Sequence, residues 1–120
     1  MVMIELFSVS EVPENSRKVI EVGGYTVLII HTQGQFFGVD NKCPHMRLPL
    51  QKGKVSDDGA IVCPFHRSVF DLASGDVKEW APWPPVVSKA LGSLAREKAL
   101  PVFQTEVRDG MLWISSEPKA

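Results

Sequence analysis

Two short motifs constrain this chain of 120 residues more than any other feature. Cys43-Pro44-His45 and Cys63-Pro64-Phe65-His66 are separated by 17 residues, and they use both cysteines and two of the three histidines. Thiolate and imidazole groups together favour iron–sulfur clusters, zinc or copper over Mg²⁺ and Ca²⁺. The proline after each cysteine restricts the backbone and favours a turn that directs two side chains toward one point. The pattern therefore predicts a metal site built from two loops.

The grouping of the ligands distinguishes among these metals. Structural zinc sites usually pair Cys with Cys and His with His, whereas each motif here carries one cysteine and one histidine. Two such loops can hold a two-iron core from both sides, with the cysteines on one iron and the histidines on the other, as in a Rieske [2Fe–2S] centre. A β domain held together by a structural zinc ion remains the alternative at this point.

The residues around the motifs resemble those of the Rieske family. Leu50 fits the end of the family's first loop, Cys-x-His-x-Gly-x-x-Leu, and Phe70-Asp71 and Ser74-Gly75 match the segment after the second loop. The resemblance is to the soluble, ferredoxin-type branch, and it implies a bound Rieske-type [2Fe–2S] cluster. It also implies that four residues bind this cofactor as its iron ligands: Cys43, His45, Cys63 and His66.

The chain departs from the family at two loop positions. Arg47 and Arg67 stand where the family has glycine, a residue that permits positive φ or a close backbone approach. Either these loops adopt another conformation, or glycine is not required there. The first loop is also basic, because residues 41–54 contain no acid and several cations: Lys42, Arg47, Lys52 and Lys54. We expect a positive rim around the histidine edge of the cluster, suited to an acidic electron-transfer partner; ordinary solvated loop charges are the alternative.

Two further residues bear on the potential of the cluster. Ser68 matches a serine of the family's high-potential branch, where its hydroxyl donates a hydrogen bond to a bridging sulfide, and Phe70 replaces a tyrosine of that branch. The resemblance therefore implies a potential above that of typical oxygenase ferredoxins and below that of respiratory Rieske proteins. A hydroxyl that only satisfies local backbone groups is the alternative for Ser68.

The rest of the chain predicts a mainly β fold. Gly23-Gly24 and Asp109-Gly110 predict tight hairpins. Alternating or β-rich segments predict strands at residues 4–9, 19–22, 25–30, 35–39, 102–108 and 111–114. Short strands with frequent turns favour a β-sandwich or barrel-like core. The resemblance implies a Rieske-type antiparallel β-sandwich with a cluster-binding subdomain of two ligand loops.

Residues 86–99 are the exception to this β pattern. Val87, Leu91, Leu94 and Ala95 recur at helical spacing, which predicts one short amphipathic helix. Compact Rieske ferredoxins usually pass this region with a short turn, so the helix is expected to be an insertion. It would either dock a partner or cap an open sheet edge.

Size and composition predict a single domain over residues 1–120, with the cluster-binding loops at about 40–80. A net charge of −1 gives no sign of a nucleic-acid or membrane partner. The N-terminus lacks the features of a secretion signal, and no segment approaches the roughly 18 apolar residues of a membrane span. Both cysteines are assigned to the site, which leaves none for a disulfide. We therefore expect a cytoplasmic protein.

A cluster held by four protein ligands has no open position for substrate, so the chain is expected to transfer electrons and not to be an enzyme itself. We predict a soluble one-electron carrier that passes electrons from a reductase to a terminal oxidoreductase such as an oxygenase. Three alternatives remain: an accessory Rieske-like subunit of a larger reductase, of the nitrite reductase small-subunit type; a redox sensor; and a zinc-stapled interaction module. The third histidine, His31, lies at a predicted strand end and is expected to be structural.

Overall fold

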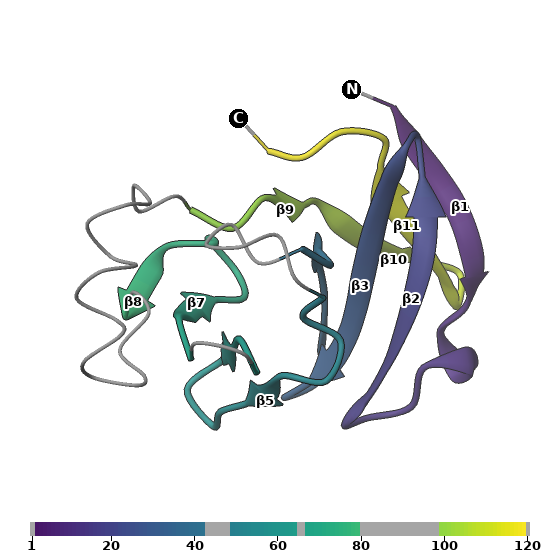
Figure 1. Ribbon diagram of the computed structural model, residues 1–120. Coiled ribbons are helices and arrows are strands. Elements are labelled where there is room, and N and C mark those ends of the chain that lie inside the picture. The colour runs from purple at the N-terminus through teal and green to yellow at the C-terminus, as the bar shows by residue number, and fades with distance from the viewer. Residues whose placement is uncertain (1, 43–48, 65–66, 80–98, 120) are drawn as a thin grey trace. The chain divides into compact units, whose positions relative to one another are not determined.

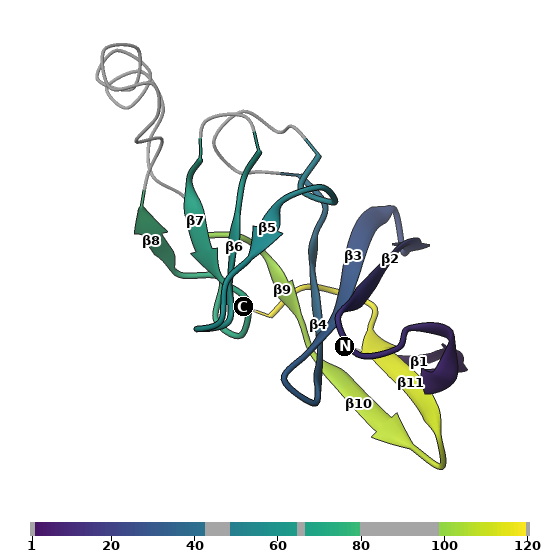
Figure 2. The same cartoon turned by 90° about the horizontal axis from the view of Figure 1, so that it is seen from below.

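The computed structural model describes residues 2–42, 49–64, 67–79 and 99–119 (Figures 1 and 2). Contacts divide the chain into two compact units, Met1–Asp40 with Pro101–Ala120, and Asn41–Leu100. Within the described residues the elements are strands and one short 3₁₀ helix, which confirms the mainly β prediction. No described helix has the length and apolar character needed to cross a membrane. The helix predicted at 86–99 falls outside the described residues except for its last position.

The elements follow one another in this order: β1 (Met3–Ser8), η1 (Val9–Glu11), β2 (Ser16–Val22), β3 (Tyr25–Thr32), β4 (Gln35–Asp40), β5 (Lys54–Val55), β6 (Ala60–Val62), β7 (Val69–Asp71), β8 (Val77–Glu79), β9 (Val102–Phe103), β10 (Thr105–Arg108) and β11 (Met111–Ser115).

The first unit contains two antiparallel sheets, one in the order β1-β11-β10 and one in the order β2-β3-β4-β9. Both sheets contribute to its hydrophobic core, as expected for a β-sandwich. Along β11, Leu112 and Ile114 are buried and alternate with the half-buried Trp113. The buried members of this core are Val12, Val22, Val27, Ile29, Phe103, Leu112 and Ile114.

The two hairpins predicted from dipeptide signals are present in the first unit. Gly23 and Gly24 connect β2 to β3 with φ values of 52° and 87°, and Asp109 and Gly110 connect β10 to β11 with φ values of 50° and 77°. Two successive residues with positive φ characterise the type I′ turn, whose twist matches that of the strands it joins. These turns set the register of both hairpins.

The strand predicted at 102–108 is divided in two, which corrects the sequence-based boundary. Residues 102 and 103 form β9 and pair with Val39 and Gly38 of β4, whereas β10 pairs with β11 of the other sheet. Gln104 lies between them and donates its backbone N–H to the Ser115 hydroxyl at 3.2 Å. The division occurs because a single β-rich segment completes the edges of two different sheets.

The second unit is built on one antiparallel sheet in the order β5-β6-β7-β8. Because successive antiparallel strands reverse direction, the β5–β6 and β7–β8 turns lie at one end of this sheet and the β6–β7 loop lies at the other. The residues that anchor the unit are large, apolar and almost fully buried: Leu50, Ile61, Phe70, Leu72 and Leu100. The β6–β7 loop begins at Cys63, so this predicted ligand lies at one end of the sheet.

Candidate metal centre

The second motif occupies the loop between β6 and β7. Cys63 follows β6 directly, and its N–H donates to the Ser68 carbonyl at 2.8 Å. The Arg67 N–H donates to the Cys63 carbonyl at 3.0 Å, which closes the loop a second time. These two bonds make Cys63 and Ser68 the neck of a hairpin loop of residues 64–67. The neck holds the Cys63 backbone in one position relative to the sheet.

The interior of this neck is shielded from solvent. Cys63 is 1% exposed, and Ser68 and Phe70 are each fully buried. Phe70 pairs in register with Ile61 on one side and Val77 on the other, so the strand leaving the loop is fixed in the middle of the sheet. Cys63 thus presents a thiol at a protected position on a fixed backbone, as a ligand for a soft metal requires.

Arg67 has a backbone φ of 61°, in the left-handed region. Residues with a Cβ adopt this region at a cost of roughly 1–2 kcal/mol, whereas glycine adopts it freely. The second loop therefore has, at this position, a conformation that suits the glycine of the family pattern, although arginine occupies it. Of the two possibilities raised by the sequence, the structure shows that glycine is not required here. Arg47, the other departure, lies outside the described residues.

The two ends of the first loop are also held together. The Leu50 N–H donates to the Asn41 carbonyl at 3.0 Å, and Lys42 and Pro49 form an isolated antiparallel bridge. Leu50, the position that fits the family pattern, is fully buried. The predicted ligands Cys43 and His45 fall between these anchored ends but outside the described residues, as does His66 of the second loop.

Gly53 connects the base of the first loop to the strand that ends in Cys63. Its N–H donates to the Leu50 carbonyl at 2.7 Å, and a Cβ built on it would lie 2.3 Å from the Val62 carbonyl oxygen. Only glycine tolerates so close a backbone contact. The base of the first loop and the neck of the second therefore lie at the same end of the sheet. Sequence reasoning passed over this glycine, for which the only signal was its place in a turn between Lys52 and Lys54.

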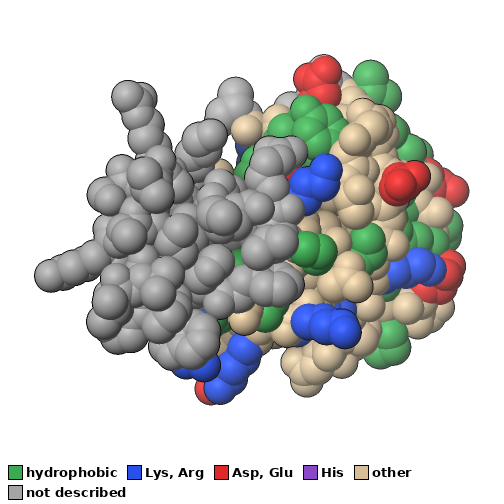
Figure 3. Space-filling view, in the orientation of Figure 1, with side chains coloured by type: hydrophobic (Ala, Val, Ile, Leu, Met, Phe, Trp, Pro, Cys, Tyr) green, Lys and Arg blue, Asp and Glu red, His purple; other side chains and the backbone are tan. Residues whose placement is uncertain are grey.

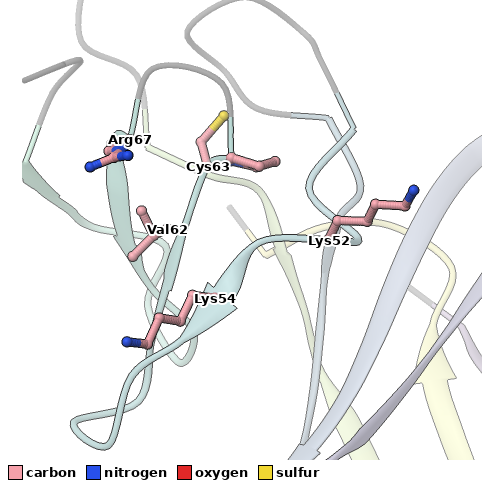
Figure 4. A pocket seen from close by; sticks show the side chains of 6 residues that line it. Lys52, Lys54, Val62, Cys63 and Arg67 are labelled. Carbon is pink, nitrogen blue, oxygen red and sulfur yellow. The ribbon is translucent and has the colours of Figure 1, made fainter. Parts of the chain in front are cut away.

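A shallow pocket of about 330 Å³ opens beside the neck of the second loop (Figure 4). Lys52, Lys54 and Arg67 are exposed, and they line it together with Val62, Cys63 and Pro64. Neither Lys52 nor Lys54 forms an ion pair with any carboxylate among the described residues. Among the described residues that line this pocket, every charged side chain is therefore cationic.

His31 does not belong to this site. It lies on β3 in the first unit, where its Nδ1 is 2.7 Å from the Val12 carbonyl oxygen and its ring stacks on Phe36 with centroids 4.0 Å apart. Nδ1 must be the donor in this contact, because a carbonyl oxygen only accepts. These contacts agree with the structural role expected for His31.

The one predicted ligand in the described part of the site, the Cys63 thiol, suits a soft metal or an iron–sulfur cluster. Within residues 2–42, 49–64, 67–79 and 99–119, no three His, Cys, Asp or Glu side chains gather into a metal site. Cys63 is the one predicted ligand in these ranges, and its surroundings contain no competing carboxylate ligand of the kind that hard cations prefer. The donor chemistry and the shared loop base are both those expected of a two-loop cluster site.

Comparison with known proteins supports this conclusion over most of the chain. The family model described as Rieske [2Fe-2S] domain matches residues 2–101. The 3-phenylpropionate/cinnamic acid dioxygenase ferredoxin subunit of Photorhabdus laumondii is 29% identical over 117 residues, which cover 94% of this chain and 95% of that protein. Apoptosis-inducing factor 3 of Homo sapiens is 32% identical over 72 residues, or 60% of this chain, and the match spans only 12% of that longer protein.

The fold is shared with a solved structure described as the complex of reduced oxygenase and oxidized ferredoxin in carbazole 1,9a-dioxygenase. A chain of that complex superposes with a TM-score of 0.76 at 22% identity, and the match covers 98% of this chain and 96% of that one. The match confirms the predicted fold class. The family model establishes the cofactor, a Rieske-type [2Fe–2S] cluster. The chain therefore belongs to the Rieske [2Fe–2S] domain family.

Proposed function

We propose that this protein is a one-electron carrier that passes electrons from a reductase to a terminal oxidoreductase of the oxygenase type. The observation that carries the proposal is the match, over nearly the whole of both chains, to a ferredoxin subunit of a dioxygenase. A ferredoxin also shares its complex with an oxygenase in the structure whose fold this chain resembles. In this proposal the oxygenase is the catalyst, and this chain is the carrier that supplies it.

We propose Cys43, His45, Cys63 and His66 as the ligands of the cluster. Support comes from the alternation of cysteine and histidine in the two motifs, from the buried position of Cys63, and from the anchored ends of both loops at one end of the sheet. When bound, the cluster supplies a one-electron redox couple, which in Rieske proteins lies at roughly −150 to +300 mV. The residues of the chain hold and shield that couple.

The described residues contribute to this role in three ways. Cys63 is held by the Ser68 carbonyl at the neck of its loop, which limits the movement of one ligand. Phe70 and Ile61 are fully buried on the strands that lead to the neck, and they exclude water from it. Gly53 brings the base of the other loop against β6. A site with fixed ligands needs little rearrangement when its charge changes, which favours electron transfer.

The partners that follow from this function are redox proteins, and we propose that they present acidic surfaces to this chain. The support is the positive environment of Lys52, Lys54 and Arg67 beside Cys63. We also propose that the two units act as one Rieske-type domain, because the family model spans residues of both. We propose the cytoplasm as the place of action, because the N-terminus lacks the features of a secretion signal.

The experiment that tests the ligand set compares histidine variants of the protein purified with its native metal. We expect His45→Gln and His66→Gln to lose the iron, the sulfide and the rhombic EPR signal that appears on reduction. His31→Gln is the matched control, because His31 is engaged with Val12 and Phe36, and it should keep the full signal. A colourless wild-type protein that contains zinc would contradict the electron-transfer function, and loss of the signal in His31→Gln alone would contradict the ligand assignment.

A further inference from the structure

We propose that the Cys63 end of the sheet in the second unit is a docking surface for an acidic face of the electron-transfer partner, a proposal that rests on the function proposed above. The surface, here called the basic end, is formed by Lys52, Lys54, Pro64 and Arg67. It specifies where the partner binds and which residues of this chain recognise it.

The topology of the sheet separates acidic from basic residues. The β5–β6 turn contains Asp57 and Asp58, and the β7–β8 turn lies between Asp71 and Asp76, so these acids gather at the end away from Cys63. The Leu72 N–H donates to the Gly59 carbonyl at 2.9 Å and joins the two turns. Among the described residues of this unit, the acids of the two turns therefore lie at the end of the sheet opposite to the basic end.

One lysine does reach the acidic end, and it is neutralised there. The Lys78 Nζ lies 3.0 Å from Asp58 Oδ2. Lys52 and Lys54 have no such partner among the described carboxylates. The uncompensated charge of these two lysines thus remains at the Cys63 end. On the face of the molecule shown in Figure 3, acidic and basic side chains both occur among the described residues.

The register of the strands places one acidic residue in the same row of the sheet as Lys54. Lys54 pairs with Val62, Val62 with Val69, and Val69 with Glu79 on β8. Glu79 therefore shares the last row of the sheet but belongs to the opposite edge strand, about 14 Å from Lys54 between backbones at the usual strand spacing. Two strands, β6 and β7, therefore separate the backbones of these two residues.

The shape of the basic end suits a protein partner. Lys54 and Arg67 lie on one side of the 330 Å³ pocket and Lys52 lies on the other, with Val62 and Cys63 between them (Figure 4). An apolar centre with a charged rim is the usual organisation of a protein interface. The arginine adds a guanidinium that can bind a carboxylate through two parallel hydrogen bonds. A carboxylate-bearing surface that covers the pocket would contact all three cations.

The backbone of Arg67 supplies an independent indication. Its φ of 61° would suit glycine better, so an arginine at this position carries local backbone strain. Strain of this kind is found at functional sites, where the surrounding structure maintains it. The strained residue places a cation one position after the proposed ligand His66.

The proposal is tested by equilibrium binding to an acidic redox protein. The probe is a dye-labelled plant-type [2Fe–2S] ferredoxin, whose fluorescence anisotropy is followed while it is titrated with the wild-type holoprotein at about 0.01 M and about 0.3 M salt. We expect Kd to rise on the order of tenfold with salt. Cytochrome c, a basic redox protein, is the charge-inverted probe and should bind more weakly at low salt.

Variants locate the effect on the surface. Lys54→Glu and Arg67→Gly should each raise Kd for the acidic probe, on the order of tenfold for Lys54→Glu, and reduce its dependence on salt. Lys119→Glu is the matched control, because it makes the same change of charge at an exposed lysine of the first unit. Arg67→Gly removes the cation and introduces a residue that adopts a φ of 61° without strain, and visible absorption equal to that of the wild type shows that the variant is folded.

The outcomes separate this proposal from the function it rests on. If Lys119→Glu weakens binding as much as Lys54→Glu, the probe responds to net charge and the basic end is not the docking surface. A coloured wild-type protein whose binding is insensitive to salt contradicts the docking surface alone. A wild-type preparation that lacks the visible absorption of the cluster contradicts the proposed electron-carrier function instead.

Discussion

Gly53 lies so close to Val62 that a Cβ built on it would be 2.3 Å from the Val62 carbonyl oxygen. The second obstacle is the Leu50 carbonyl oxygen at 3.0 Å. Both obstacles are backbone atoms, which cannot move aside as the tip of a side chain can. This contact joins the base of the first loop to the strand that leads into Cys63, so the spacing of the two loops depends on it.

We expect Gly53→Ala to destabilise the protein by about 1–3 kcal/mol, the usual cost of overpacking, and to lower its cluster content. The measurements are the midpoint of urea unfolding and the iron and sulfide per chain. Gly38→Ala is the matched control, since its Cβ would first meet the Ile114 side chain at 3.1 Å and its φ is not left-handed. Equal losses in the two variants would show that the Gly53–Val62 contact has no special role.

Arg67→Gly should increase the free energy of unfolding by about 0.5–1 kcal/mol. Relief of the left-handed conformation contributes roughly 1–2 kcal/mol, and the greater freedom of glycine in the unfolded chain offsets part of this gain. Arg67→Ala is the control, because it removes the side chain but keeps the Cβ that makes φ of 61° unfavourable. Urea unfolding of both variants distinguishes the two effects, and a gain of the same size in Arg67→Ala would attribute it to the side chain.

Ser68→Ala should lower the midpoint potential by an amount on the order of tens of millivolts, because a hydroxyl that donates to the cluster favours its more negative, reduced state. Ser68 is fully buried beside the Cys63 neck, where its carbonyl already accepts the Cys63 N–H. The measurement is a redox titration followed by EPR. Ser56→Ala, in the turn at the opposite end of the sheet, should leave the potential unchanged. An unchanged potential in Ser68→Ala would show that the hydroxyl does not donate to the cluster and has only a local structural role.

The pKa of Asp58 is lowered, chiefly by the hydrogen bond from the Ser56 hydroxyl and further by the hydrogen bond and charge of Lys78. A lowered pKa in the folded state means that ionised Asp58 favours folding above the ordinary value of 3.8, and that this contribution disappears as the pH falls through the folded-state pKa. Asp58→Asn should therefore lower the urea midpoint slightly at pH 7 and have less effect near pH 3.

The partners of Asp58 supply the control for this prediction. In a Lys78→Met background, Asp58→Asn should have a smaller effect at pH 7, because part of the interaction has already been removed. Salt should reduce the effect in the wild-type background, since the group is exposed. An effect of Asp58→Asn that is the same at both pH values would show that the carboxylate charge is not its cause.

Much of the fold could be predicted because its signals are local. Gly23-Gly24 and Asp109-Gly110 adopt positive φ at both positions, and this preference belongs to the dipeptides themselves. Alternation of apolar and polar residues marks the strands for the same reason, since side chains project to opposite faces in turn. The kinds of donor atom at the site, and their grouping into two pairs, likewise follow from residues that are neighbours in the chain.

Tertiary structure decided what depends on segments far apart in the sequence. Residues 102–108 are divided between two sheets because β4 and β11 each have an edge for this segment to complete. Gly53 is indispensable only because the Val62 carbonyl lies against it. One end of a sheet carries three cations, Lys52, Lys54 and Arg67. The acids of the turns lie at the other end, because antiparallel strands alternate in direction. Local propensity extends over a few residues, whereas strand order determines which distant side chains meet.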